Sequence, residues 1–142
     1  MKISKTIFSQ SAELDISIII VSFNTREILL RCLESIKKQT NGISYEVIVV
    51  DNASEDNTVT AVTEKFSNIN VIANKENRGF SAANNQGILS SKGEKIAFLN
   101  PDTLLTENSF KKISNYMNEN PEFSILGSGI VDKNNKPCPI RL

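Results

Sequence analysis

One carboxylate in this sequence stands where a buried segment stops abruptly, a position at which a side chain can be held for chemistry. Residues 97–105 read AFLNPDTLL, so that Asn100, Pro101 and Asp102 separate two apolar runs. A lone Asp just past a strand end can bind a divalent metal ion or a substrate hydroxyl group, and Asp after Pro also forms plain turns. The residue types alone leave these three interpretations of Asp102 open.

Three other apolar segments also end in polar residues. These ends hold Ser22 and Asn24 near the end of residues 16–23, Asp51 and Asn52 near the end of residues 45–51, and Arg78 and Gly79 beyond residues 70–73. Each has a structural interpretation: Asn24 as a helix cap, Asp51-Asn52 as a turn and Arg78 as a solvated loop charge. An acid at each of two separate strand ends, Asp51 and Asp102, is harder to dismiss than either acid alone.

The elements that would position these side chains alternate between strands and helices. Strands are expected at residues 16–23, 45–51, 70–73, 94–100 and 123–132, the last with a glycine-marked bend. Amphipathic helices with apolar residues at helical spacing are expected between them. This alternation predicts an α/β fold with three α/β/α layers and a mostly parallel sheet. Parallel strands bring their C-terminal ends to one edge, where ligands bind, so the polar ends are expected to converge there.

Local signals predict how the helices begin and how one of them packs. Asn24 with Glu27 resembles a capping box, the acidic residues 54–56 are expected to cap the second helix, and Thr106 the last. Leu105 against Phe110 resembles a hydrophobic staple. Small residues in 80–88 predict a helix that packs close to its neighbours.

Composition is that of one globular domain. The chain has 142 residues, of which 39% are hydrophobic and 23% are charged, a usual balance for a soluble domain. Its 16 basic and 16 acidic residues cancel, and the absence of a basic cluster disfavours nucleic acid as a partner. No apolar run approaches the ~20 residues that cross a bilayer. Residues 1–15 are expected to form a flexible leader and residues 16–142 the domain.

The residue inventory excludes several kinds of catalytic site. The chain has no histidine and two cysteines, Cys32 and Cys138, which rules out a Cys–His pair, a Ser–His–Asp triad and a zinc site. Cys32 is expected to be a small core residue. Neither G-x-G-x-x-G nor G-x-x-x-x-G-K-[ST] occurs, so the charge of a phosphorylated ligand would have to be met by a cation such as Mg²⁺.

Four motifs together resemble a known family. IIIVSFNTREILLRCLESI, EVIVVDNASEDNT, NRGFSAANNQGI and FLNPDT are similar, in this order and spacing, to the nucleotide-sugar-binding half of family-2 glycosyltransferases with the GT-A fold, in particular the rhamnosyltransferase-like branch. The resemblance covers about residues 16–131. It implies a hexosyltransferase of cell-surface polysaccharide biosynthesis, cytoplasmic or peripheral at the inner face of the membrane.

The resemblance also implies roles for single residues. Asp51 matches the acid that recognises a pyrimidine base, with Ser22 and Asn24 beside that base. Arg78, Gly79 and Phe80 would shape the nucleotide pocket. Asn100-Pro101-Asp102 stands in the place of the D-x-D motif, which makes Asp102 the ligand of Mg²⁺ or Mn²⁺. Asn100, where the family often has its first Asp, would contact ribose or metal-bound water.

The resemblance implies transfer, with inversion, from a UDP- or dTDP-sugar to a saccharide or lipid-linked acceptor. The family's general base lies in an acceptor-binding half, so it is expected beyond Leu142, and the chain is expected to be truncated and catalytically incomplete alone. The alternatives are a non-catalytic nucleotide-sugar-binding or interaction module and a nucleotidyltransferase. The latter is disfavoured because VSFNTRE lacks a glycine- and lysine/arginine-rich loop.

Overall fold

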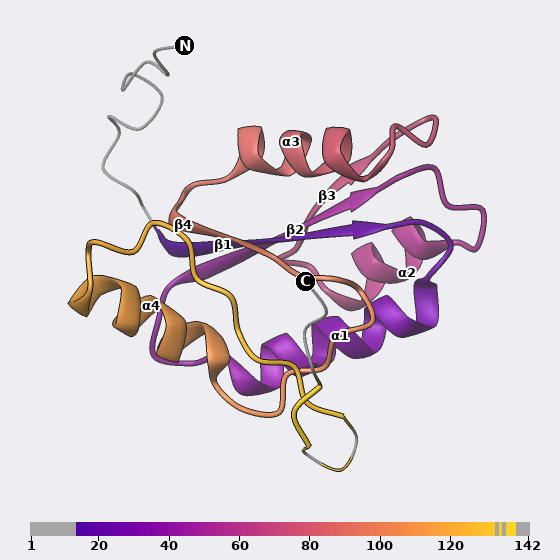
Figure 1. The fold of residues 1–142 in the computed structure, drawn as a ribbon. Coiled ribbons are helices and arrows are strands. Elements are labelled where there is room, and N and C mark those ends of the chain that lie inside the picture. Colours follow the sequence, from indigo (N-terminus) through magenta and orange to yellow (C-terminus); the bar gives the residue numbers. More distant parts are fainter. Residues whose placement is uncertain (1–13, 133, 135, 139–142) are drawn as a thin grey trace.

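A computed structural model describes residues 14–132, 134 and 136–138 of the chain (Figure 1). Its sheet has four parallel strands in the order β3-β2-β1-β4. The strands are β1 (Leu14–Ser22), β2 (Tyr45–Asp51), β3 (Asn70–Ala73) and β4 (Gly93–Phe98). The helices are α1 (Arg26–Gln39), α2 (Thr58–Lys65), α3 (Phe80–Ser90) and α4 (Ser109–Glu119). The predicted α/β architecture with a parallel sheet is confirmed.

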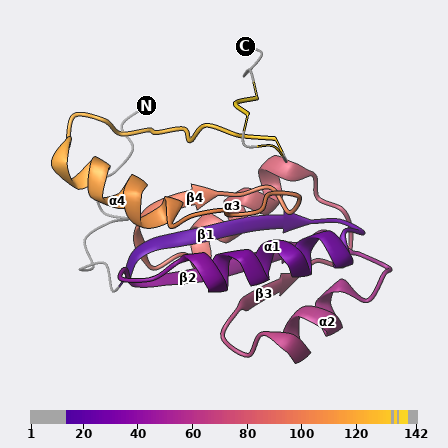
Figure 2. The same ribbon diagram turned by 90° about the horizontal axis from the view of Figure 1, so that it is seen from below.

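Helices cover both faces of the sheet (Figures 1 and 2). On one face, alternate residues of β1, among them Ile16 and Ile18, pack with α1 and with residues of α2 and α4. On the other face, Ile19 packs with Ile48 and with Ala83 of α3. The β-branched runs of β1 and β2 are buried on both faces because each strand lies inside the sheet. The expected three layers are therefore present.

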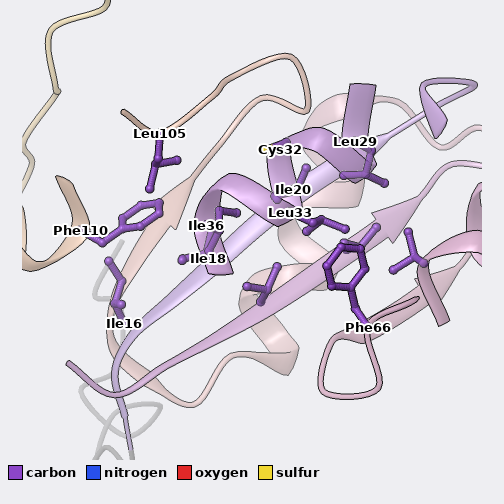
Figure 3. Packing of buried hydrophobic residues seen from close by; sticks show 13 residues of the cluster. Ile16, Ile18, Ile20, Leu29, Cys32, Leu33, Ile36, Phe66, Leu105 and Phe110 are labelled. Atoms are coloured by element: carbon purple, nitrogen blue, oxygen red, sulfur yellow. The ribbon is translucent and has the colours of Figure 1, made fainter. Parts of the chain in front are cut away.

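The larger core cluster joins α1 to the segment after β4. Leu33 and Ile36 of α1 are buried there, and Leu105 and Phe110 approach the same cluster (Figure 3). Cys32 is fully buried among these residues, as the sequence predicted. No helix in the described part of the chain has the length and apolar character needed to span a membrane.

Glycine allows α3 to lie close to the sheet. A Cβ atom added at Gly87 would come within 2.5 Å of Cγ2 of Ile19, which is far inside van der Waals contact. The prediction of a closely packed small-residue helix at this point is confirmed.

Three local predictions are wrong. Residues 123–132 form no strand: they are exposed, and only an isolated bridge pairs Val131 with Pro137. The N-caps of α1 and α4 are Thr25 and Asn108, neither with a side-chain capping bond, whereas Asn24 and Thr106 were expected. β1 also begins at Leu14, two residues early, and β4 ends at Phe98, two residues early.

Candidate functional site

The C-terminal ends of the strands meet at one edge of the sheet, as parallel pairing requires. Ser22 pairs in register with Asp51, and Asp51 pairs with Ala73 of β3. On the other side of β1, the Leu99 amide donates to the Ile19 carbonyl at 3.0 Å. The loops that follow the four strands therefore start side by side, and the predicted convergence of their polar residues is found.

Asp51 organises the loop that follows β2. Its side chain is 2% exposed, and its carboxylate accepts hydrogen bonds from the Ser54 amide (2.9 Å) and the Ser54 hydroxyl (2.6 Å). Between the two residues, Ala53 has a φ of 67°, a left-handed conformation that is strained for alanine. In this arrangement Asp51 holds a tight turn, and a carboxylate with further lone pairs can still accept a bond from a ligand.

Asn24 ties the first loop to this second one. Its side-chain oxygen accepts a hydrogen bond from the Glu55 backbone amide at 2.8 Å. Its backbone amide donates to the Ser54 hydroxyl at 2.8 Å. Asn24 has a φ of 53°, which Asn tolerates better than most residues. The expected capping role of Asn24 on α1 is therefore replaced by a bridge between two loops.

The capping group of α1 comes from a distant part of the sequence. The Arg26 amide, the first of the helix, donates to the Asp56 carboxylate at 2.9 Å. The same carboxylate accepts from the Thr58 amide and hydroxyl at the start of α2. Burial would raise the pKa of Asp56, but the bonds from Thr58 and Arg26 outweigh it and leave this pKa below its usual value. One acid thus serves the N-termini of two helices, where negative charge is favourable.

Ser22 lies beneath this pair of loops. It is fully buried, and its hydroxyl is 2.9 Å from that of Thr25. Ser22, Asn24 and Asp51 are thus brought together, and protein hydrogen bonds hold all three. Together they form a hydrogen-bonded base of the site, here called the floor, at the ends of β1 and β2.

Arg78 and its neighbours lie on the loop that leads into α3. Gly79 is the N-cap of α3, with a φ of 81° that glycine adopts freely, and its amide donates to the Asn77 side chain at 2.9 Å. Arg78 and Phe80 are exposed. Within the described part of the chain, the guanidinium of Arg78 has no hydrogen bond or ion pair, so it is free to meet a ligand.

The loop with Asp102 is held in place by α1. The Cys32 thiol donates weakly to the Asn100 carbonyl at 3.9 Å, and the Leu105 amide donates to the Ser35 hydroxyl at 3.0 Å. The Asn100 carbonyl also accepts from the Thr103 amide at 3.1 Å. Burial, with the nearby charge of Asp102, raises the pKa of Cys32 to about 12, so the thiol stays protonated. The loop is fixed at both ends while Asp102 is exposed.

The residues at this edge fit a divalent metal ion that is shared with a ligand. No group of three or more His, Cys, Asp or Glu residues that could hold a metal occurs in the described ranges, and Asp102 has no hydrogen-bond or ion-pair partner among them. Mg²⁺ is usually bound by one or two carboxylates, water and substrate phosphates. An exposed, partner-free carboxylate suits that mode.

Several contacts at the site were not recognised from the sequence. Asp56 caps α1 across 30 positions, and Asn74 and Gln86 bond each other at 2.9 Å. Asn52 was expected at this edge or in a turn, and the structure shows that it is 3% exposed and accepts a bond from Asn74. Asn52 and Asn74 follow apolar strands, and this position was the only signal that could have suggested their involvement.

Comparisons with known proteins agree with this geometry. The family model described as "Glycosyl transferase family 2" matches residues 17–139. The minor teichoic acid biosynthesis protein GgaB of Bacillus subtilis is 34% identical over 114 residues, which are 78% of this chain and 13% of GgaB. The poly(ribitol-phosphate) beta-N-acetylglucosaminyltransferase TarP of Staphylococcus aureus is 34% identical over 128 residues, which are 87% of this chain and 39% of TarP.

Solved structures share the fold. S. aureus TarS 1-349 in complex with UDP-GlcNAc matches with a TM-score of 0.67 and 25% identity, over 75% of this chain and 32% of that one. The mannosyltransferase PcManGT of Pyrobaculum calidifontis, in complex with GDP-Man and Mn²⁺, has a TM-score of 0.61 and 23% identity, over 78% and 36% of the two chains. The present chain therefore spans well under half the length of these relatives.

Proposed function

The chain belongs to glycosyl transferase family 2, and from this premise we propose that its C-terminal sheet edge binds a nucleotide-diphosphate sugar together with Mg²⁺ or Mn²⁺. One observation carries the proposal: Arg78 and Asp102 are exposed and without partners in the described residues, at the same edge of the sheet as the hydrogen-bonded residues Asn24 and Asp51. A cation and an anion left free beside a fixed floor suit a ligand that has a base, a ribose and a diphosphate.

Each residue has a role in this proposal. Asp51, with Ser22 and Asn24 beside it, faces the edge of a pyrimidine base, and Arg78 with Gly79 and Phe80 closes the nucleotide pocket. Asp102 holds the metal, and Asn100 contacts ribose or metal-bound water. The metal supplies positive charge that stabilises the leaving nucleoside diphosphate. The left-handed backbone of Asn24 and Ala53 supports this reading, because such strain tends to gather at ligand sites.

The reaction of the whole protein is proposed to be inverting hexosyl transfer. An acceptor hydroxyl forms a bond to the anomeric carbon as the bond from that carbon to the diphosphate oxygen breaks, and a carboxylate takes the hydroxyl proton. UDP- and dTDP-sugars are the proposed donors. TarS is solved with UDP-GlcNAc, GgaB is named as a minor teichoic acid biosynthesis protein and TarP as a poly(ribitol-phosphate) beta-N-acetylglucosaminyltransferase. These names support a saccharide or lipid-linked acceptor of the cell surface. Free thiols at Cys32 and Cys138 support a cytoplasmic location.

The preference for one class of nucleotide base tests this proposal. We predict that UDP and dTDP bind the chain more tightly than ADP and GDP, and that Asp51→Asn narrows this gap because an amide presents a donor where the carboxylate presents only acceptors. Calorimetric titration of the four nucleotides into both proteins, with Mn²⁺ present, measures the gap. Circular dichroism serves as the control that the substituted chain keeps its overall fold. A purine preference in the parent would overturn the assignment of Asp51.

A second prediction concerns transfer. Two of the acids after Asp102 have partners: Glu107 forms an ion pair with Lys112, and the Asp132 carboxylate accepts hydrogen bonds from two backbone amides. The other two, Glu119 and Glu122, are exposed. We therefore propose that none of them is the general base, which alone is worth roughly 10²–10⁴ in rate.

Incubation of this chain with UDP- and dTDP-sugars, Mn²⁺ and saccharide or lipid-linked acceptors is expected to show donor binding, with transfer slower by roughly that factor than in a full-length relative. The matched control is TarP under the same conditions. Metal-dependent transfer at the rate of TarP would show that the base is present and that its proposed absence among these acids is wrong.

A further inference from the structure

Three amide side chains form a continuous chain of hydrogen bonds beneath the loop that carries Arg78. The side-chain nitrogen of Asn74 donates to the side-chain oxygen of Asn52 at 3.0 Å and to the side-chain oxygen of Gln86 at 2.9 Å. Gln86 returns a bond to the Asn74 oxygen at 2.9 Å. We call Asn52, Asn74 and Gln86 the amide relay. It links the ends of β2 and β3 to the middle of α3.

The relay ends on the residue next to Arg78. The Asn52 amide nitrogen donates to the Gly79 carbonyl at 3.3 Å, and this carbonyl also accepts the first helical bond of α3, from the Ala83 amide at 3.2 Å. Its middle member is attached to the sheet, since the backbone amide of Asn74 donates to the Asp51 carbonyl at 2.9 Å. The Gly79 carbonyl, one residue beyond Arg78, is therefore held both by Asn52 at the end of β2 and by α3.

The reciprocal pair fixes the orientation of its members. Asn74 and Gln86 each donate to and accept from the other, so neither amide can turn over without facing oxygen against oxygen or nitrogen against nitrogen. Asn52 is buried and Asn74 and Gln86 are half-buried, so an amide left without its partner also carries a desolvation cost. The relay consequently has one favourable arrangement, and it transmits that arrangement to Gly79.

We infer that the amide relay is a positioning device for Arg78, which sets the direction from which this cation meets the donor nucleotide. This inference rests on the proposed function, because it assigns the relay to the same site. The relay residues do not contact the ligand themselves. They act by holding the Gly79 peptide, whose left-handed backbone would otherwise move freely.

A double-mutant cycle tests the inference with the 142-residue chain. Gln86→Leu removes both bonds to Asn74, and we expect UDP affinity to fall about five- to tenfold, in the range of coupling between neighbouring residues. On an Arg78→Ala background the same change is expected to have no further effect, because the group that it positions is gone. A purely structural role would weaken binding equally on both backgrounds.

Two further variants keep the outcome decisive. Gln86→Glu preserves the volume and can still accept from Asn74 but cannot donate to it. It is expected to lower UDP affinity on the parent background and not on the Arg78→Ala background, so the test stands even if Gln86→Leu unfolds. Asn85→Leu, on an exposed neighbour of the same helix, is the matched control and is expected to leave affinity unchanged. Additive effects of Gln86 and Arg78, or no effect of either Gln86 variant, would overturn the inference. Failure of the parent to bind UDP would instead overturn the proposed function on which it rests.

Discussion

Replacing Asp102 with Asn is expected to remove the metal-dependent part of UDP binding while the fold persists. Asp102 is the acid of the Asn100–Thr103 turn, it is exposed, and it makes no side-chain bond within the described residues. An Asn has the same shape but no charge, and metal–diphosphate binding depends on charge. Loss of residues that merely support a metal ligand costs about 10- to 100-fold in metal affinity, so loss of the ligand itself should cost at least as much.

Calorimetric titration of UDP with and without Mn²⁺ measures this effect. The parent is expected to bind UDP more tightly when Mn²⁺ is present, and Asp102→Asn is expected to bind equally with and without it. Glu64→Gln, at an exposed acid of α2, changes the net charge by the same amount and should behave as the parent does. A full metal response in Asp102→Asn would show that another group holds the ion.

Replacing Gly93 with Ala is expected to destabilise the domain strongly. A Cβ atom at this position would lie 2.4 Å from the Ser17 backbone nitrogen and 2.5 Å from the Ile16 carbonyl carbon. These are backbone atoms of β1, which cannot rotate away, so β4 would have to shift from its neighbour. Overpacking usually costs about 1–3 kcal/mol, and we expect the upper end of that range or more because backbone must move.

Thermal unfolding followed by circular dichroism measures this loss. At roughly 3–5 °C per kcal/mol for a domain of this size, Gly93→Ala should lower the Tm by about 10 °C. The matched control is Gly127→Ala, where an added Cβ meets nothing within 4 Å, and its effect should stay within about 0.5 kcal/mol. Equal Tm values for the two variants would show that β4 does not lie against β1 as described.

The sheet could be predicted from sequence because its signals are local. The runs at residues 16–23 and 45–51 are rich in β-branched residues, and such runs are typical of strands buried on both faces. The end of β2 at Asp51 was predicted correctly, and parallel pairing then brought Ser22 and Asp51 together. The position of Arg78 and Asp102 at this edge was predicted from their place after apolar strands, and the structure adds that both side chains are exposed.

The contacts between loops could not be predicted, because their partners are distant in sequence. The capping rules consider residues within a few positions, so they assigned Asn24 to α1, whereas Asp56 performs that role from the next loop. The prediction of a strand at residues 123–132 was wrong for a related reason. Strand propensity reflects packing against neighbours, and this segment is exposed, with Phe123 stacked on Tyr116 at 6.1 Å.

The most direct test of the site is to locate a bound Mn²⁺ ion by its paramagnetic broadening of backbone amide signals in the ¹⁵N-labelled chain with UDP. We predict that the strongest broadening falls on the amides of Leu99, Asn100, Asp102 and Thr103, with weaker effects at Asn24 and Asn52 near the ends of β1 and β2. Asp102→Asn is expected to abolish the pattern. Broadening centred on Glu119 and Glu122, or on Asp15 at the opposite edge of the sheet, would contradict it.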